Sequence, residues 1–422
     1  MYGPWSRMQL GMRRAVKEAV SSVLERSGGR NWLGAIQRRR SGGCRVQIFA
    51  WHRIVPDFEG MRKRVIPGML TSTRTFERQL DWVARTYRIA TLDFALEVLA
   101  GREKSDRDLC VITFDDGYAD LLEHAVPILR RHGAPAIVYV SSGHVDSGEP
   151  LLHDRLYRLL KLVGDKRMRP GPGTELLARA SSAGAAATLD SLLERHPRAF
   201  CLRLAENLER SLGEDPRAAA PDCRLLGWDE LRAVQAAGVQ VGAHTIDHRC
   251  LPNESLGEGE RQLRIPMERI EAELGTRVRH FAYPNGWYSK QAMEQLAAAG
   301  YRSAVTTEDR PTQLGANPYA LPRKCVWEYT SRGLSGYSSS VNSCNLDGTL
   351  GLLGGAIGIP RWVPGERHPA DRSHAGDGSV SNPRQSTPLG GRGSRGRRAK
   401  VDGVPTREAA QVQESQTTSA EG

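Results

Sequence analysis

Short apolar runs alternate with amphipathic segments along most of the chain, and each apolar run is followed by a polar or glycine-containing turn. Strands that alternate in this way with helices of about 10 to 15 residues predict parallel pairing through crossover helices. The predicted strands are 46–51, 89–92, 109–112, 136–140, 239–243, 279–283, 301–306 and 320–326. The predicted helices are 76–87, 93–100, 119–132, 231–237, 262–274 and 290–299.

The alternation defines one α/β domain over residues 46–330. It is interrupted at about 150–223, where a Leu-, Ala- and Arg-rich stretch predicts an insertion of two or three helices around the loop 170–173. The pattern fades in the extension 331–363. Residues 364–422 hold few large apolar side chains, cannot repay the entropy of ordering, and are predicted to be disordered.

Residues 1–45 form a basic N-terminal segment. Within it, residues 9–26 carry apolar side chains at helical spacing with basic residues between them, which predicts an amphipathic helix. This helix either covers the flank of the domain or lies on a membrane surface as a peripheral contact. The net charge of +11 is concentrated in the two ends of the chain. Because the middle is closer to balanced, no specific nucleic-acid partner is predicted; binding through the basic ends alone is the alternative.

The seven cysteines are odd in number, scattered, and never arranged as CxxC. This argues against a disulfide framework and a thiolate zinc site, and it favours a reducing compartment. No apolar run reaches the roughly 18 residues of a membrane span. Charged residues such as Arg13 and Glu18 interrupt any signal-peptide core. The expected location is the cytoplasm or the cytoplasmic face of a membrane, with an extracellular location as the alternative.

Two adjacent carboxylates, Asp115 and Asp116, follow the predicted central strand, and Gly117 lets the backbone turn. Adjacent side chains on an extended chain point opposite ways, so one carboxylate can face a metal while the other faces a reacting water. A polar turn after a strand is the alternative interpretation. In folds of this kind the chemistry lies at the carboxyl ends of the strands, where His52 and His144 also fall.

A second cluster, His244 and His248, begins where another strand ends. The spacing places two imidazoles on one face of a helical turn, which suits one divalent ion. One carboxylate, two imidazoles and water make an open mixed site for Zn²⁺, Co²⁺, Ni²⁺ or Fe²⁺. A third element, residues 281–286, closes a strand on Pro-Asn-Gly, a tight turn whose N–H groups can stabilise an oxyanion.

These three elements, in this order, resemble the polysaccharide deacetylases, the NodB-homology domain of carbohydrate esterase family four, and the exopolysaccharide branch in particular. The matching segments are 113–117, 244–248 and 281–286, with support from 51–54 and 321–323. The resemblance implies a distorted (β/α) barrel with fewer than eight strands. It also implies Asp115 as catalytic base, the N–H of Asn285 at the oxyanion, and a divalent metal, Zn²⁺ first, held by Asp116, His244 and His248. Sugar contacts are expected from Tyr283, Pro284, Gly286 and Arg323.

The sequence departs from the family pattern in two places. Ala282 stands where many members carry an Arg, so whatever orients Asp115 must come from elsewhere. The late His that serves as general acid is also missing, which leaves His52, His144 and His153 unassigned. We favour His52, which resembles the Tyr-His-x-Val element of the exopolysaccharide branch; a structural His packed beside Trp51 is the alternative.

The predicted function is a metal-dependent hydrolase that removes N-acetyl groups from N-acetylhexosamine units of a poly- or oligosaccharide, in exopolysaccharide biosynthesis. The expected substrate is an N-acetylated glycan, with a lipid-linked glycan as one form of it; O-deacetylation uses the same machinery. The alternative is a catalytically impaired glycan-binding or scaffold protein that retains the fold.

Overall fold

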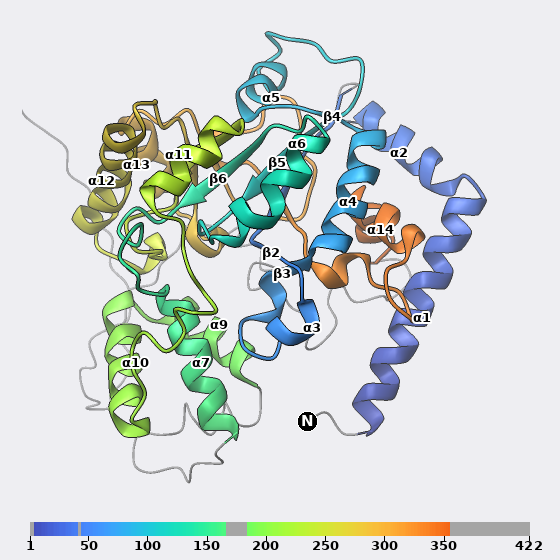
Figure 1. Ribbon diagram of the computed structural model, residues 1–422. Helices are drawn as coiled ribbons and strands as arrows, with labels where there is room; N and C mark the ends of the chain where they lie inside the picture. Colours follow the sequence, from blue (N-terminus) through green and yellow to red (C-terminus); the bar gives the residue numbers. More distant parts are fainter. Residues whose placement is uncertain (1–3, 41–43, 166–183, 355–422) are drawn as a thin grey trace, which may run out of the picture. The chain divides into compact units, whose positions relative to one another are not determined.

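The computed structural model describes residues 4–40, 44–165 and 184–354, and all of these belong to one compact unit. Its centre is a parallel sheet in the order β10-β1-β5-β6-β7-β8-β9 (Figure 1). An eighth strand, β4, lies off this path and pairs with the start of β5. The strands are β1 (Val46–Trp51), β4 (Arg88–Ile89), β5 (Leu109–Phe114), β6 (Ala136–Val140), β7 (Val239–Ala243), β8 (His280–Ala282), β9 (Ser303–Val305) and β10 (Lys324–Cys325).

The two ends of the strand order meet. Val305 in β9 forms a parallel bridge with Leu321, just before β10. The Leu321 N–H donates to Ala304 O at 2.9 Å, and the Thr306 N–H donates to Leu321 O at 2.8 Å. The sheet therefore curls into a distorted (β/α) barrel, as predicted, with seven strands along its path.

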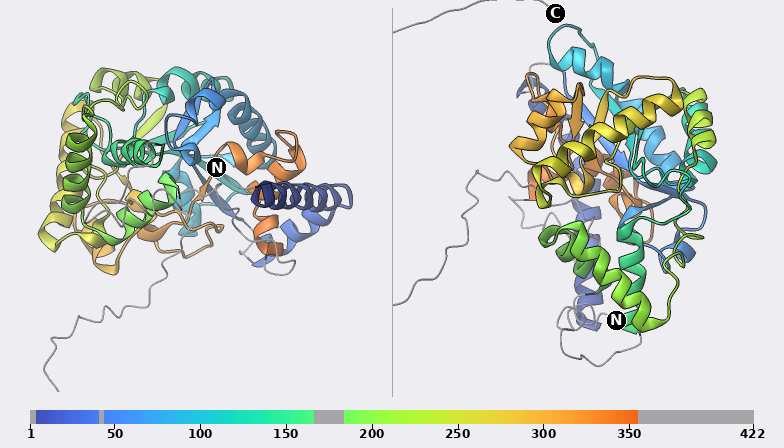
Figure 2. Two further views of the ribbon diagram at one scale, coloured as in Figure 1. Left: turned by 90° about the horizontal axis from the view of Figure 1, so that it is seen from below. Right: turned by 90° about the vertical axis from the view of Figure 1, so that its left-hand side faces the viewer.

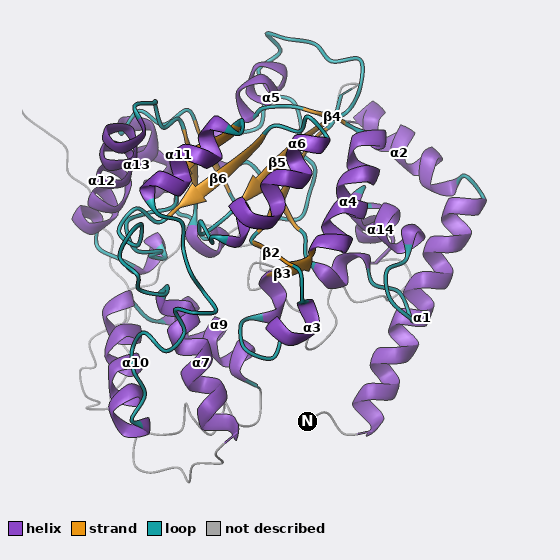
Figure 3. Ribbon diagram, in the orientation of Figure 1, coloured by secondary structure: helices purple, strands orange, loops and turns teal. Residues whose placement is uncertain are grey.

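The apolar side chains divide between the two faces of the sheet, as the period of two requires. Ile112 and Phe114 of β5 belong to the main core beneath the outer helices, whereas Val111 belongs to a separate cluster with Tyr139 and Val305. The covering helices are α4 (Thr73–Thr86), α5 (Leu92–Leu99), α6 (Val126–Arg131), α11 (Trp228–Ala236), α12 (Leu256–Leu274) and α13 (Lys290–Ala298), which surround the sheet in Figure 3.

Several helix starts have an ordinary chemical cause. The side chains of Ser72, Thr91, Ser255 and Ser289 accept N–H groups of the first turns of α4, α5, α12 and α13.

Three predicted elements differ from the observed ones. The predicted helix 119–132 is a short π-helix over Leu121–Ala125 followed by α6. The predicted strands 89–92 and 320–326 are shorter than expected, because only Arg88–Ile89 and Lys324–Cys325 pair in the sheet.

The insertion consists of α7 (Leu152–Asp165), α9 (Ala185–Arg195) and α10 (Arg198–Leu212), which lie together below the sheet in Figure 1. Their apolar faces form a second core with side chains such as Leu156, Leu192 and Ala205. The same core includes Leu70 of a separate two-stranded sheet formed by β2 (Arg53–Val55) and β3 (Leu70–Ser72), with α3 (Phe58–Met61) between them. Neither small strand was predicted. The loop 170–173 lies outside the described residues.

The ends of the described chain lie side by side. The helices α1 (Pro4–Arg26) and α2 (Gly29–Arg40) adjoin α14 (Ser339–Leu346) and α15 (Thr349–Gly354), as two views agree (Figures 1 and 2). The apolar pattern did not predict α14, because its residues are mostly polar and small and their hydroxyls bond within the protein, as Ser343 does with Glu25.

Within the described residues no helix combines the length and the apolar character needed to cross a membrane. The tail 364–422 falls outside them.

Candidate metal centre and active site

The three sequence elements meet in one pocket at the carboxyl edge of the sheet. Its lining comes from the strand ends, from the segment before β3, and from the insertion. The lining residues are His52, Ile66, Met69, Asp115, Asp116, His153, Leu189, Asp190, Leu193, His244, His248, Asn285 and Thr307. The predicted residues Asp115, Asp116, His244, His248, His52 and Asn285 are therefore all brought together.

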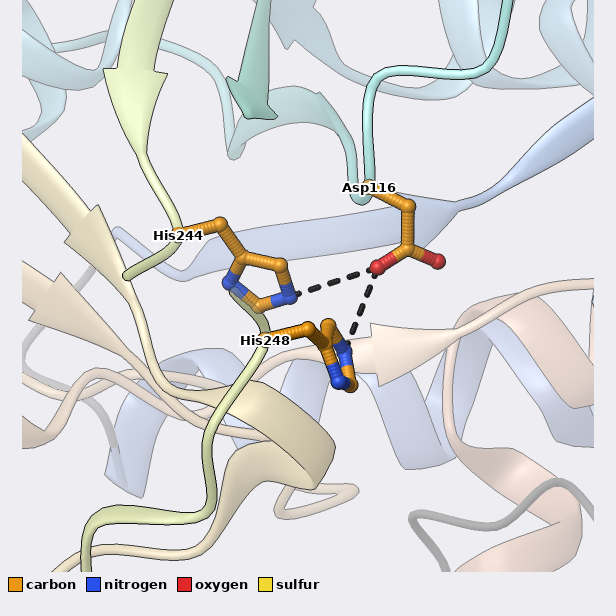
Figure 4. A group of neighbouring side chains, drawn as sticks. All are labelled: Asp116, His244 and His248. Carbon is orange, nitrogen blue, oxygen red and sulfur yellow. Dashed lines mark ion pairs between the residues drawn. The ribbon is translucent and has the colours of Figure 1, made fainter. Parts of the chain in front are cut away.

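Asp116, His244 and His248 form a compact three-ligand group (Figure 4). The Nε2 atoms of His244 and His248 lie 3.5 and 3.2 Å from Asp116 Oδ1. An ion with ligands at about 2.0–2.2 Å in tetrahedral geometry holds its ligand atoms roughly 3.3 Å apart. The spacing of this group therefore fits one divalent ion.

The hydrogen bonding of the Asp116 carboxylate is a second indication of a cation site. Both of its carboxylate oxygens are buried, and neither accepts a hydrogen bond from the described protein atoms. A buried carboxylate without donors is costly unless an ion or a proton compensates it. Burial raises the pKa of Asp116, but the two neighbouring imidazoles outweigh this and hold the pKa well below its ordinary value. The donor set thus fits a divalent cation.

The two imidazoles are oriented for ligation. Nδ1 of His244 lies 2.7 Å from the carbonyl oxygen of Ala282, so the Nδ1–H donates there and Nε2 faces Asp116. Burial lowers the pKa of His248 to about 4 despite the nearby Asp116, so its imidazole is neutral at pH 7. Burial also lowers the pKa of His244, whereas Asp116 and Asp115 raise it, and the net shift is upward.

The backbone is held in rare conformations at this site. Five non-glycine residues in the described chain have positive φ, and four of them lie in the three elements: Asp116, Thr245, His248 and Asn285. Such conformations cost of order 1–3 kcal/mol each and cluster at functional sites. At Gly117, with φ +79°, a Cβ atom would come within 2.9 Å of Val140 Cγ1, so the turn after the Asp pair requires glycine.

Two premises of the sequence analysis were wrong. The Asp pair is not extended, because β5 ends at Phe114 and Asp116 adopts φ 73°. Both carboxylates consequently face the same pocket, and their different partners rather than opposite directions separate them. His244 and His248 are not on a helical turn either: they lie in a loop after β7 in which Thr245 and His248 have positive φ.

Arg323 supplies the partner of Asp115 that Ala282 cannot. Its NH1 and NH2 nitrogens donate to the two oxygens of Asp115 at 2.7 and 2.6 Å. NH1 also donates to Thr113 Oγ1 and Nε donates to Thr306 O. Burial raises the pKa of Asp115, but the guanidinium outweighs that effect and keeps the pKa below its ordinary value. Asp115 is therefore an ionised, fixed carboxylate.

The Arg323 side chain, from which a sugar contact was expected, is occupied by this contact. The Arg323 side chain is 0% exposed, and its donors are engaged inside the barrel. Tyr283, Pro284 and Gly286 are buried as well and are not among the described residues that line the pocket. Tyr283 instead donates its hydroxyl to Tyr319 O at 2.9 Å. A Cβ on Gly286 would collide with Thr307, so this glycine lets the turn close.

The three unassigned histidines are now distinguished by position. His52, directly after β1, and His153, in α7 of the insertion, both line the pocket, whereas His144 does not. His144 Nδ1 lies instead 3.3 Å from the carbonyl oxygen of Glu149. Burial lowers the pKa of His52 even though Asp116 and Asp115 oppose the shift. His52 is thus placed as the sequence interpretation requires, and His153 is a second candidate.

The insertion contributes more to the site than the sequence indicated. The His153 ring packs edge-on against the His248 ring, with 4.7 Å between centroids. His153 Nε2 lies 2.9 Å from the hydroxyl of Tyr118, which also bonds Asp154 at 2.8 Å. Leu189, Asp190 and Leu193 of α9 form one wall of the pocket. The only sequence signal for this wall is the apolar spacing along 185–195.

One carboxylate and two imidazoles converge at the carboxyl edge of this parallel barrel, next to a second carboxylate that Arg323 holds. The protein is therefore a parallel barrel with a candidate site for one ion. Residues 102–304 match the family model described as polysaccharide deacetylase. The chain therefore carries a domain of the polysaccharide deacetylase family.

Individual relatives are distant. YxkH of Bacillus subtilis (strain 168), which is named as a polysaccharide deacetylase on a provisional basis, is 20% identical over 264 residues, or 62% of this chain and 66% of YxkH. The chain thus matches just under two thirds of that relative. Among solved structures, IcaB from Ammonifex degensii is 20% identical with a TM-score of 0.45, covering 68% of this chain and 94% of IcaB. The Streptococcus pyogenes deacetylase PplD in complex with acetate is 15% identical with a TM-score of 0.45, covering 67% and 92%.

Proposed function

We propose that this protein is a metal-dependent deacetylase that hydrolyses the N-acetyl groups of N-acetylhexosamine units in a glycan. The observation that carries the proposal is the pairing of two carboxylates with different partners in one pocket. Asp115 is held by Arg323 at 2.6 Å, while Asp116 faces His244 and His248 and accepts no hydrogen bond within the described chain. Metal-assisted amide hydrolysis uses both a proton acceptor and a cation site of this kind.

The residues divide the chemistry between them. Asp116, His244 and His248 would hold the ion, with Zn²⁺ as the first choice and Co²⁺, Ni²⁺ or Fe²⁺ as alternatives. When bound, a divalent ion polarises the acetamido carbonyl and lowers the pKa of the attacking water. Asp115, ionised because of Arg323, accepts the proton of that water as general base.

Two further groups complete the proposed reaction. Asn285 lines the pocket on the turn after β8, where its backbone N–H can donate to the oxyanion. His52, once protonated from solvent, donates that proton to the leaving amine, and the C–N bond breaks to give acetate and a free amino sugar. Asp115 then returns the proton of the attacking water to solvent. The apolar wall of Leu189 and Leu193 lies beside these groups, where it can exclude water and contact the sugar.

A scaffold protein without turnover is the rival proposal, and it rested on the two departures from the family pattern. The first departure is Ala282 in place of an Arg, and Arg323 compensates for it because it holds Asp115 as the missing Arg would. His52 lines the pocket, and this position supports it as the replacement for the missing acid. Both observations favour the enzyme.

We further propose a membrane-side setting for the substrate. All seven cysteines are free thiols, which fits a reducing compartment, so we place the protein in the cytoplasm or on the cytoplasmic face of the membrane. A lipid-linked glycan intermediate of exopolysaccharide synthesis is a substrate of the right class for that setting. The exopolysaccharide branch of the family is part of the same proposal.

Acetate release tests the proposal. The full chain, supplied with Zn²⁺, is incubated with a panel of N-acetylated and O-acetylated oligosaccharides. We expect acetate from the N-acetylated members, loss of release with chelator, and loss in Asp115→Asn. Metal binding without acetate from any member would favour the scaffold instead.

A further inference from the structure

The polar side of helix α1 faces the rest of the protein. Glu18 accepts the backbone N–H of Leu334 at 2.8 Å, and Glu25 accepts the hydroxyl of Ser343 at 3.0 Å. Ser21 on the same side is 0% exposed. Hydroxyls and carboxylates therefore join α1 to α14 and to the segment before it.

The apolar side of α1 faces outward. Met12, Val16 and Val23 are 55%, 50% and 65% exposed. At about 100° per residue these three positions fall within roughly 40° of one another around the helix axis. A helix on a soluble protein normally buries such a stripe. In α1 the orientation is reversed: the apolar stripe faces outward and the polar side faces the protein. Figures 1 and 2 show α1 at the periphery of the described chain.

The segment that carries the stripe is strongly basic. Residues 4–40 contain nine Arg or Lys residues and two Glu residues. Both Glu residues bond inward, and of the basic residues Arg30 pairs with Asp347 and Arg38 with Asp108. Arg26, at the end of α1, and Arg39, in α2, are exposed. Trp32 of α2 is 65% exposed, and tryptophan favours membrane–water interfaces.

We infer that this outward face of α1 and α2 binds the surface of an anionic lipid bilayer. Apolar side chains would enter the interface while the neighbouring arginines meet the lipid phosphates, which is how amphipathic basic helices bind membranes. A second copy of the chain is a poorer occupant because it would bring two basic segments together. The segment 355–422 is also a poor match, because it holds ten basic and seven acidic residues and is itself basic.

Vesicle co-sedimentation with the full chain tests this inference. The probes are phosphatidylcholine vesicles with and without phosphatidylglycerol, at low and high salt. The variant is Val16→Asp/Val23→Asp, which changes exposed positions only. The matched control is Leu256→Asp/Leu314→Asp, whose side chains are 56% and 45% exposed on other parts of the protein.

We expect binding to the phosphatidylglycerol vesicles that weakens in high salt, because exposed charges are screened. The Val16→Asp/Val23→Asp variant should bind at least roughly tenfold more weakly, while the control keeps wild-type affinity. Equal loss in both variants, or no binding of the wild type, would overturn the inference. So would lipid-free self-association that disappears only in the α1 variant, which would identify a second copy as the occupant.

This inference does not depend on the proposed catalysis. Acetate release from a soluble oligosaccharide should be unchanged in Val16→Asp/Val23→Asp, because neither residue lines the pocket. A protein that binds vesicles but releases no acetate would contradict the proposed function and leave the membrane surface intact.

Discussion

The guanidinium of Arg323 donates hydrogen bonds to both oxygens of the Asp115 carboxylate, at 2.7 and 2.6 Å, although the two residues are 208 positions apart in the chain. The pair lies inside the barrel, with side-chain exposures of 0% and 4%. A bidentate Arg–carboxylate pair fixes the orientation of the carboxylate as well as its charge. Asp115 is thereby kept ionised beside a site that would itself attract a cation.

Replacing Arg323 by Lys should slow catalysis more than it weakens substrate binding. Lys keeps a charge but loses the bidentate geometry, so the base is less well aligned and kcat should fall. Because Arg323 lowers the pKa of Asp115, the variant should raise that pKa and move the acid limb of the kcat–pH profile to higher pH. Acetate release measured across pH, at saturating substrate, checks both effects.

Arg45→Lys is the matched control for this substitution. Arg45 also forms a buried pair, with Asp108, through Nε and NH2 at 2.9 and 2.8 Å. Lys at either position keeps the positive charge but loses the forked donor geometry of Arg, which weakens the buried pair. Both variants should therefore lose stability, but only Arg323→Lys should shift the pH limb. A shift of equal size in Arg45→Lys would assign the effect to general destabilisation.

Removing one imidazole should abolish tight metal binding. Loss of a partner behind a metal ligand already costs about 10–100-fold in affinity, so loss of the ligand itself in His248→Ala should cost at least about 100-fold. Titration calorimetry with Zn²⁺ measures this directly, without any substrate. His280→Ala is the control, because His280 is a buried imidazole that bonds Ser303 on the neighbouring strand and does not line the pocket. Unchanged affinity in His248→Ala would remove His248 from the ligand set.

The parts of the site that lie at strand ends were predictable from sequence because a strand end is a local feature. The strand predicted over 109–112 extends to Phe114, directly before Asp115, and the strand 239–243 ends directly before His244. In a parallel barrel such ends converge at one edge, so Asp115, Asp116, His244 and His248 could be grouped without coordinates.

The remaining features depend on the folded chain. Arg323 precedes the short strand β10, and nothing in its neighbourhood shows that its side chain runs inside the barrel to Asp115. The positive φ values of Asp116 and His248 are fixed by tight turns that periodicity does not report. The position of His153 and of the α9 wall follows from how the insertion packs against the pocket, which its helical pattern cannot determine.

The carboxyl of Asp154 should stabilise the fold less as the pH rises. Burial raises the pKa of this carboxyl to about 6, although Arg53 and the Tyr118 hydroxyl oppose the shift. Between its ordinary value of 3.8 and about 6 the folded protein then binds more protons at this residue than the unfolded chain does. The contribution of Asp154 to the free energy of unfolding therefore falls as pH rises through that window.

Asp154→Asn removes this titration. The free energy of unfolding of the variant, relative to wild type, should rise from pH 4 to pH 6 and stay level above it, because the window ends at a pKa of about 6. Urea unfolding at a series of pH values gives the difference. Asp229→Asn, at a side chain that is 100% exposed, is the control and should show no such slope. A flat difference for Asp154→Asn would contradict the raised pKa.

The identity of the general acid can be separated from the rest of the site by the choice of leaving group. An amine leaves only when protonated, whereas p-nitrophenolate leaves without a proton, so only amide hydrolysis needs the acid. His52→Ala should therefore lower acetate release from an N-acetylated oligosaccharide by about 10²–10⁴-fold while leaving p-nitrophenyl acetate hydrolysis nearly unchanged. His144→Ala is the control, because His144 does not line the pocket and should affect neither substrate. If His153→Ala shows the selective loss and His52→Ala does not, the proton comes from the insertion, and His52 is a structural residue beside Trp51.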